Sequence, residues 1–201
     1  MDDTNGELSV KDKGDSKEPV KGAGVFGMWL FIVALGMLFA ASMVGYLVVR
    51  LKAPEWPPAG TPGLPLGLYF STFLIIGSSL TMHGALDSLR RNRQVLARWM
   101  LAATLALGTV FLVSQIGAWW TMAASRSSGD ANLFTFTFYM LTALHAAHLL
   151  CGLAPLAVTC AKAFKGAYSP EWNLPVKLMG MYWHFLMIVW LVMFGVLIAG
   201  G

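Results

Sequence analysis

Four histidines give this sequence its widest chemical range, because they fall within or beside long apolar segments: His83, His145, His148 and His184. A histidine can bind a metal or haem iron, relay a proton or form a hydrogen bond between helices. His145 and His148 are three residues apart, so they share one face of a helix. Ionisable groups are costly to bury inside a membrane, which makes all four histidines candidates for a functional role.

Haem binding is the most specific of these possibilities. A haem b needs histidines at matched depth on two facing helices, and the best pair is His83 with His184. At the helical rise per residue, His184 lies about 10 Å from the end of its segment whereas His83 lies close to the end of its own, so the match is poor. We therefore expect neutral histidines that contact neighbouring helices or lipid head groups, with no haem held by this chain. A haem b membrane anchor remains an alternative.

Other chemistry-bearing patterns are missing from the sequence. Cys151 and Cys160 fall in one apolar segment without a CxxC or CxxCH pattern, which argues against a disulfide framework, a zinc site or covalent haem attachment. There is also no GxSxG, P-loop or HExxH motif. We expect no catalytic residue and no metal site in this chain.

All ten acidic residues lie outside the apolar segments, at Asp2, Asp3, Glu7, Asp12, Asp15, Glu18, Glu55, Asp87, Asp130 and Glu171. Pumps and proton-coupled transporters usually relay protons through carboxylates within the membrane. The sequence also has no inverted repeat of the kind that many transporters carry. Both observations count against a pump, and they make a small transporter the weakest alternative.

The elements that position these residues follow from composition. The chain has 201 residues, of which 57% are hydrophobic and only 12% are charged, against about 25% charged in a typical soluble domain. Apolar runs of this length predict spanning helices. We expect an all-α integral membrane bundle of five transmembrane helices over residues 25–201, with spans near Gly27–Val49, Leu64–Ala85, Met100–Ala123, Phe134–Ala161 and Leu178–Ala199.

The polar N-terminal stretch, residues 1–24, is not a signal peptide and predicts a disordered cytoplasmic tail. Basic residues set the orientation of the spans. With five spans, the tail and the loops after the second and fourth spans lie on one side of the membrane. That side has eleven lysines and arginines: Lys11, Lys13, Lys17, Lys21, Arg90, Arg91, Arg93, Arg98, Lys162, Lys165 and Lys177. The other side has three: Arg50, Lys52 and Arg126. The N-terminus is therefore predicted inside and the C-terminus outside. No basic stripe with interleaved aromatic residues points to nucleic acid.

Small and aromatic residues predict where the helices pack. Gly36, Ala40 and Gly45 recur at roughly helical spacing, which favours close approach of another helix. Ser71, Ser78, Ser79 and Thr81 are expected to do the same in the second segment. Several tryptophans fall partly near span ends, where aromatic belts form: Trp29, Trp119, Trp120, Trp183 and Trp190.

Residues 182–190 read YWHFLMIVW, which closely resembles the last-helix signature of subunit III of haem-copper respiratory oxidases. Three further stretches resemble that family in the same order: GMWLFIVALGMLFA from Gly27, LPLGLYFSTFLIIGSSLTMHGALDSLRRN from Leu64, and FYMLTALHAAHLLCGL from Phe138. The similarity covers about residues 25 to 200. The chain resembles the short, five-helix bacterial form of the family.

The resemblance implies a non-catalytic subunit of a terminal oxidase in aerobic electron transport, in the bacterial inner membrane. Such a subunit binds no haem or copper, holds phospholipid in a cleft between helix groups, and supports assembly and stability of the catalytic subunit I, which carries the haem and copper. Five residues are then expected to make lipid or interhelical contacts: His145, His148, Tyr182, Trp183 and His184. The electron donor, cytochrome c or quinol, stays open, and an accessory subunit of a nitric oxide reductase is the nearest alternative.

The chain departs from the family pattern at three intramembrane acids. The resemblance aligns these acids with Leu35, Ala118 and Met187. A role in proton handling that depends on a membrane glutamate is therefore not expected here. The resemblance instead favours structural support of the partner and contact with lipid.

Overall fold

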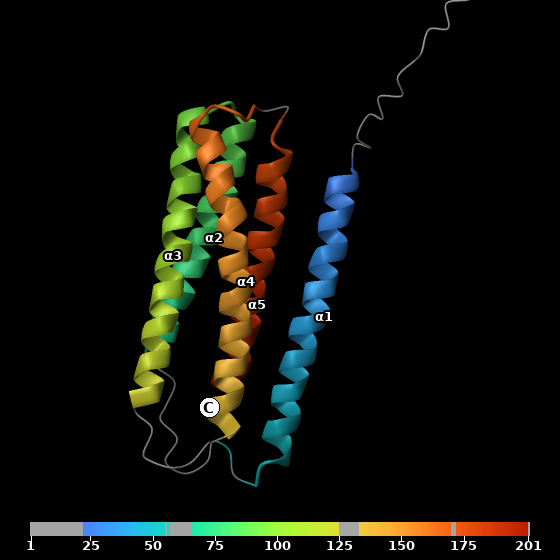
Figure 1. The fold of residues 1–201 in the computed structure, drawn as a ribbon, viewed down its shortest axis with the longest axis vertical. Coiled ribbons are helices and arrows are strands. Elements are labelled where there is room, and N and C mark those ends of the chain that lie inside the picture. The colour runs from blue at the N-terminus through green and yellow to red at the C-terminus, as the bar shows by residue number, and fades with distance from the viewer. Residues whose placement is uncertain (1–21, 55, 57–65, 125–132, 170–171, 201) are drawn as a thin grey trace, which may run out of the picture.

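A computed structural model describes residues 22–54, 56, 66–124, 133–169 and 172–200. The secondary structure in these ranges is entirely helical (Figure 1): α1 (Ala23–Lys52), α2 (Gly67–Arg90), α3 (Gln94–Ala124), α4 (Leu133–Phe164) and α5 (Leu174–Gly200). The all-α prediction is confirmed, and each predicted apolar segment has its helix. Most helices extend beyond the apolar segments predicted from the sequence. Their terminal turns contain polar or basic residues, which an apolar run does not include. The predicted tail lies outside the described residues, apart from Gly22, Ala23 and Gly24, of which the last two are already helical.

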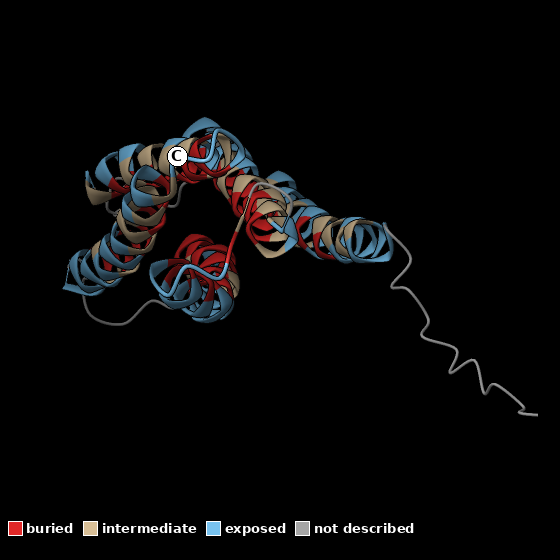
Figure 2. Ribbon diagram, turned by 90° about the horizontal axis from the view of Figure 1, so that it is seen from above, coloured by how far each residue is buried: buried red, intermediate tan, exposed pale blue. Residues whose placement is uncertain are grey.

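The helices form an arc with one helix inside it. Contacts between neighbours give the order α3, α2, α5, α1 along the arc, and α4 touches α3, α5 and α1. Within the described ranges α2 and α4 do not touch, and α1 touches neither α2 nor α3. Seen along the bundle, α4 therefore lies on the concave side of the other four (Figure 2). The last two helices, α4 and α5, join α1 to the rest of the bundle.

Four of the described helices are long and apolar enough to cross a membrane: α1, α3, α4 and α5. Helix α2 falls short of this hydropathy because serine, threonine and glycine recur along it. Its polar side chains are directed into the bundle, since Ser71, Ser78 and Ser79 are buried.

One end of the bundle collects most of the basic residues. The start of α1, the α2–α3 turn and the α4–α5 connection lie at this end (Figure 1). The described residues there include Arg90, Arg91, Arg93, Arg98, Lys162, Lys165 and Lys177, whereas the opposite end has Arg50 and Lys52. The grouping of loops that underlies the predicted orientation is thus seen in the fold.

The α2–α3 turn is short and hydrogen-bonded. Asn92 adopts a positive φ of 58°, a conformation in which asparagine is one of the few tolerated residues. The amide of Arg93 donates to the carbonyl of Ser88 at 2.8 Å, which closes the end of α2. Arg91 also pairs with Asp87 at 2.9 Å. This turn fixes α2 and α3 as antiparallel neighbours.

At the opposite end, one arginine ties the outermost helix to the bundle. Arg50, in the last turn of α1, donates from Nη2 to the carbonyl of Ala199 at 2.7 Å. A cation near the C-terminal carbonyls of a helix is favourable, because those carbonyls lack amide partners and carry partial negative charge. The contact holds the C-terminal ends of α1 and α5 together.

Candidate functional site

The indole of Trp183 lies at the centre of the packing between helices. The residue is completely buried, and its Nε1 donates to the hydroxyl of Ser78 at 2.8 Å. The Ser78 hydroxyl donates in turn to the carbonyl of Thr104 at 3.1 Å. One chain of hydrogen bonds therefore joins α5 to α2 and α2 to α3.

Two glycines make room for the aromatic side chains of α5. A methyl group added at Gly108 of α3 would lie 2.8 Å from Cζ2 of Trp183. One added at Gly152 of α4 would lie 2.5 Å from Cε1 of Tyr182. Both distances are far shorter than a normal contact of 3.5–4.0 Å. Only a residue without a Cβ fits at either position, so α3 and α4 approach α5 closely.

Tyr182 connects α5 to α4 and α1. Its hydroxyl donates to the backbone carbonyl of His148 on α4 at 2.8 Å. Its ring lies 5.9 Å, centroid to centroid, from that of Phe31 on α1. Tyr182 and Trp183 thus make contacts with all four other helices between them.

His184 points toward α2, next to another histidine. Its Nδ1 is hydrogen-bonded to the hydroxyl of Ser79, and its ring centroid lies 6.0 Å from that of His83. The pair proposed from sequence as the best haem candidate is therefore adjacent in the fold. One ring nitrogen of His184 is already engaged by serine, and no group of three or more histidine, cysteine or acidic residues gathers anywhere in the described ranges.

His145 is completely buried among aromatic rings. The centroids of Phe39, Phe111 and Trp190 lie 6.2, 5.8 and 5.1 Å from that of its imidazole. Among the described residues, neither ring nitrogen has a hydrogen-bond partner. The imidazole therefore contacts three neighbouring helices through aromatic packing, and its ring nitrogens form no hydrogen bond to the described residues.

His148 lies one turn further along α4 and makes a local bond. Its Nδ1 is 2.7 Å from the carbonyl of Leu144 in the same helix. Its ring packs against Phe39 of α1 at 5.1 Å. Together with its backbone carbonyl, which accepts from Tyr182, His148 occupies the meeting point of α1, α4 and α5.

A second polar junction lies two turns along α5 and was not predicted as a site. Trp190 is completely buried and donates from Nε1 to the hydroxyl of Thr72 at 3.0 Å. Nearby on α2, Ser71 accepts from Nε2 of Gln115 at 3.0 Å. The sequence suggests aromatic-belt positions for Trp183 and Trp190, whereas the structure places both in the core. Their seven-residue spacing, which puts them on one helix face, was the available signal.

The three positions that lack the family's acids lie in apolar surroundings. Leu35 and Ala118 are buried, and Met187 is partly buried against the hydrophobic core. A Cβ built on Gly67, at the start of α2, would lie 4.0 Å from the Cβ of Ala118. None of these positions supplies a group that can exchange a proton.

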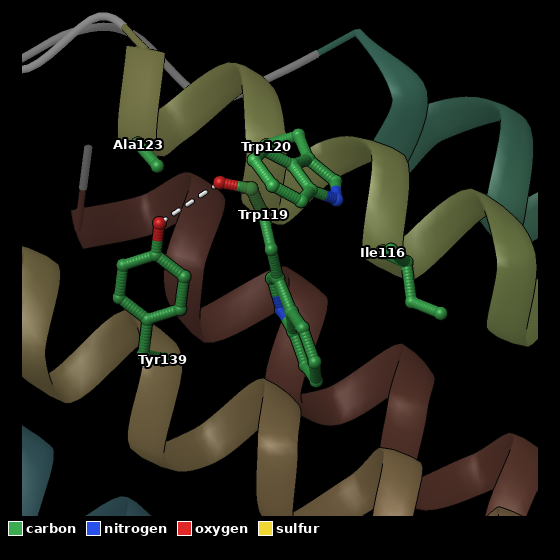
Figure 3. Close-up of a pocket in the computed structure, with 5 residues that line it drawn as sticks. All are labelled: Ile116, Trp119, Trp120, Ala123 and Tyr139. Atoms are coloured by element: carbon green, nitrogen blue, oxygen red, sulfur yellow. Dashed lines mark hydrogen bonds between the residues drawn. The ribbon is translucent and has the colours of Figure 1, made fainter.

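An apolar hollow of about 300 Å³ lies between α3 and α4 near the end opposite the basic residues (Figure 3). It is lined by Ile116, Trp119, Trp120, Ala123 and Tyr139. The hydroxyl of Tyr139 donates to the backbone carbonyl of Trp119 at 2.9 Å, and Nε1 of Trp119 donates to Thr142 at 3.0 Å. The lining thus offers no nucleophile or acid–base pair to a substrate.

The hydrogen bonds at Ser78 lead to a measurable prediction. Replacing Ser78 with alanine removes an acceptor for Trp183 and a donor to Thr104, and interhelical bonds in membranes contribute about 0.6 kcal/mol each on average. We expect the free energy of unfolding of the detergent-solubilised chain to fall by about 1 kcal/mol. The matched control is Ser42→Ala, since the hydroxyl of Ser42 donates to the carbonyl of Leu38 in its own helix. Equal losses in both variants would contradict the junction.

The fold and these junctions define a class of protein: a bundle of apolar helices whose buried polar groups serve mainly to join helices. Comparison with known families then places it more closely. The sequence profile described as "Cytochrome c oxidase subunit III" matches residues 7–199. The chain belongs to this family, as the resemblance of its motifs indicates.

Individual relatives support the same placement. A cytochrome c oxidase subunit 3 from Synechocystis sp. is 35% identical over 173 residues, covering 85% of this chain and 72% of the relative. One from Thermostichus vulcanus is 27% identical over 86% of this chain and 85% of the relative. A cytochrome bo(3) ubiquinol oxidase subunit 3 from Pseudomonas aeruginosa is 28% identical over 90% of this chain and 86% of the relative. Relatives thus occur in both cytochrome c and quinol oxidases.

Proposed function

We propose that this chain is the non-catalytic subunit III of a terminal respiratory oxidase and supports the assembly and stability of the haem-copper catalytic subunit. The observation that carries the proposal is the family match across residues 7–199. The site geometry agrees with it, because Trp183, Tyr182 and Trp190 join helices through their polar groups. The apolar residues at Leu35, Ala118 and Met187 favour structural support over proton handling.

The proposed role places the chain in a bacterial inner membrane, next to catalytic subunit I, other oxidase subunits and phospholipid. Five helices would then span the bilayer. Helix α2 has 24 residues, which is about 36 Å and long enough to cross. The hydroxyls of Thr81, Ser71 and Thr72 are bonded to Thr104, Gln115 and Trp190, so they need not meet lipid.

The proposed orientation has its own test. With an odd number of spans and the basic end of the bundle in the cytoplasm, the C-terminus at Gly201 lies in the periplasm. A C-terminal alkaline phosphatase fusion is expected to be active and a C-terminal green fluorescent protein fusion dark. The reverse pattern would show that the orientation, or the number of spans, is wrong.

Deletion of the gene tests the function itself. We expect the deletion strain still to make the catalytic subunit. Compared with the wild type, the amount of assembled oxidase should be lower, or its activity should decline faster during turnover. Complementation with the wild-type chain restores both. Unchanged assembly, lifetime and turnover of every terminal oxidase in the deletion strain would rule the proposal out.

Two alternatives from the sequence remain distinguishable. A nitric oxide reductase subunit would co-purify with a different catalytic subunit, and the relatives described above are oxidase subunits. A haem b anchor would show a Soret band when the chain is isolated. His83 and His184 are the residues such a haem would need, and the bond from His184 to Ser79 disfavours it.

A further inference from the structure

A second hollow, of about 540 Å³, lies at the α2–α3 turn, at the basic end of the bundle. It is lined by Asn92, Arg93, Gln94, Val95, Leu96 and Trp99. It is separate from the junctions around Trp183, because these residues belong to the turn and the first two turns of α3. The hollow combines one cation, two amide side chains and an apolar wall.

The polar part of the hollow favours an anion. Arg93 is exposed and directly precedes α3, whose first amides carry partial positive charge. Within the described ranges the nearby acid is Asp87, and it is already paired with Arg91 at 2.9 Å. Gln94 donates to the carbonyl of Tyr168 at 3.0 Å, which fixes that wall against the segment following α4. Among the described residues, no unpaired carboxylate competes for Arg93 when a charged group enters here.

The apolar part of the hollow continues along the exposed face of α3. Val95 and Trp99 at the hollow are 66% and 64% exposed, and Val113 further along is 63% exposed. The stripe ends at Trp120, which is 70% exposed. Trp99 and Trp120 are 21 residues apart, or about 31 Å along the helix. This matches the hydrocarbon thickness of about 30 Å, with a tryptophan at each interface.

We propose that this hollow binds the head group of an anionic phospholipid. Arg93 holds the phosphate, Trp99 lies at the level of the glycerol, and the acyl chains run along the outer face of α3. An acidic protein segment would satisfy Arg93 equally well. The apolar stripe that continues from Val95 for the depth of a bilayer favours lipid instead. The inference rests on the proposed membrane placement and assigns one specific contact within it.

The test uses the full chain reconstituted in phosphatidylcholine vesicles, with lipids carrying brominated acyl chains as quenchers of tryptophan fluorescence. The signal of Trp99 is the difference between the wild type and Trp99→Phe. Brominated phosphatidylglycerol is expected to quench this signal at a mole fraction about fivefold lower than brominated phosphatidylcholine, as one basic residue at a surface allows. Arg93→Gln should bring the two lipids within about twofold of each other.

The matched control is Arg90→Gln, which removes the same charge from an exposed residue of the same end that does not line the hollow. Equal quenching by the two lipids in the wild type would overturn the proposal. So would an equal effect of both arginine variants, which would show diffuse attraction to the surface. If Trp99 shows no lipid preference in vesicles but is shielded from acrylamide in the purified oxidase complex, the hollow is a contact with a partner subunit. These outcomes leave co-purification with the oxidase unchanged, so they are distinct from failure of the proposed function.

Discussion

Replacing Trp183 with alanine is expected to lower the free energy of unfolding of this chain by about 3–5 kcal/mol. The indole is completely buried and lies against Gly108 and Gly152 while bonded to Ser78. Its removal leaves a cavity where α2, α3, α4 and α5 meet. Because lipid is as apolar as the bundle interior, packing supplies most of the association energy there, and a cavity removes it directly.

The measurement is unfolding of the full chain in mixed micelles, followed by the loss of helix. Trp183→Phe keeps one ring but removes the bond to Ser78 together with part of the packed volume, so its cost should fall between that of Ser78→Ala and that of Trp183→Ala. A Trp183→Ala variant within 1 kcal/mol of the wild type would show that the junction does not hold the bundle together.

Adding one methyl group at Gly152 is expected to be the second most damaging change. In Gly152→Ala the new Cβ would lie 2.5 Å from Cε1 of Tyr182. The ring cannot move away freely, because its hydroxyl is bonded to the carbonyl of His148. Overpacking of this kind costs about 1–3 kcal/mol, and it should be seen as a lower free energy of unfolding and as less assembled oxidase.

A matched control comes from a glycine in open space. A Cβ at Gly45 of α1 meets nothing within 4 Å, so Gly45→Ala should be neutral or stabilising by up to about 1 kcal/mol. In a Tyr182→Ala background the cost of Gly152→Ala should largely disappear, because the clash is gone. A cost that stays the same in both backgrounds would mean that Tyr182 is not the cause.

The helices themselves were predictable from sequence, and their packing faces were not. Long apolar runs locate each helix because backbone groups in lipid must be bonded within the segment. The apolar pattern does not show which side of a helix packs against other helices, because the lipid-facing and helix-facing sides are both apolar. Gly36, Ala40 and Gly45 were expected to mark a close approach, yet Ala40 and Gly45 are exposed. The glycines under real constraint are Gly108 and Gly152.

The polar side chains carried more information than the apolar ones. Serines on α2 were expected at helix contacts, and Ser78 and Ser79 bond to Trp183 and His184 of α5. His145 shows the limit of this reasoning. Its type suggests a hydrogen bond, whereas the described structure surrounds it with rings. A sequence identifies the donor, but the partner depends on which helix lies opposite, and that is decided by the tertiary arrangement.

The most direct test of the account is purification of the native complex through a tag on this chain, in a mild detergent, with identification of every polypeptide and a visible spectrum. We predict that a haem-copper oxidase catalytic subunit co-purifies in fixed ratio, that the complex shows its haem absorbance, and that the chain separated from it shows none. Recovery of the chain alone, or with a catalytic subunit that reduces no oxygen, would contradict the assignment as subunit III of a terminal oxidase.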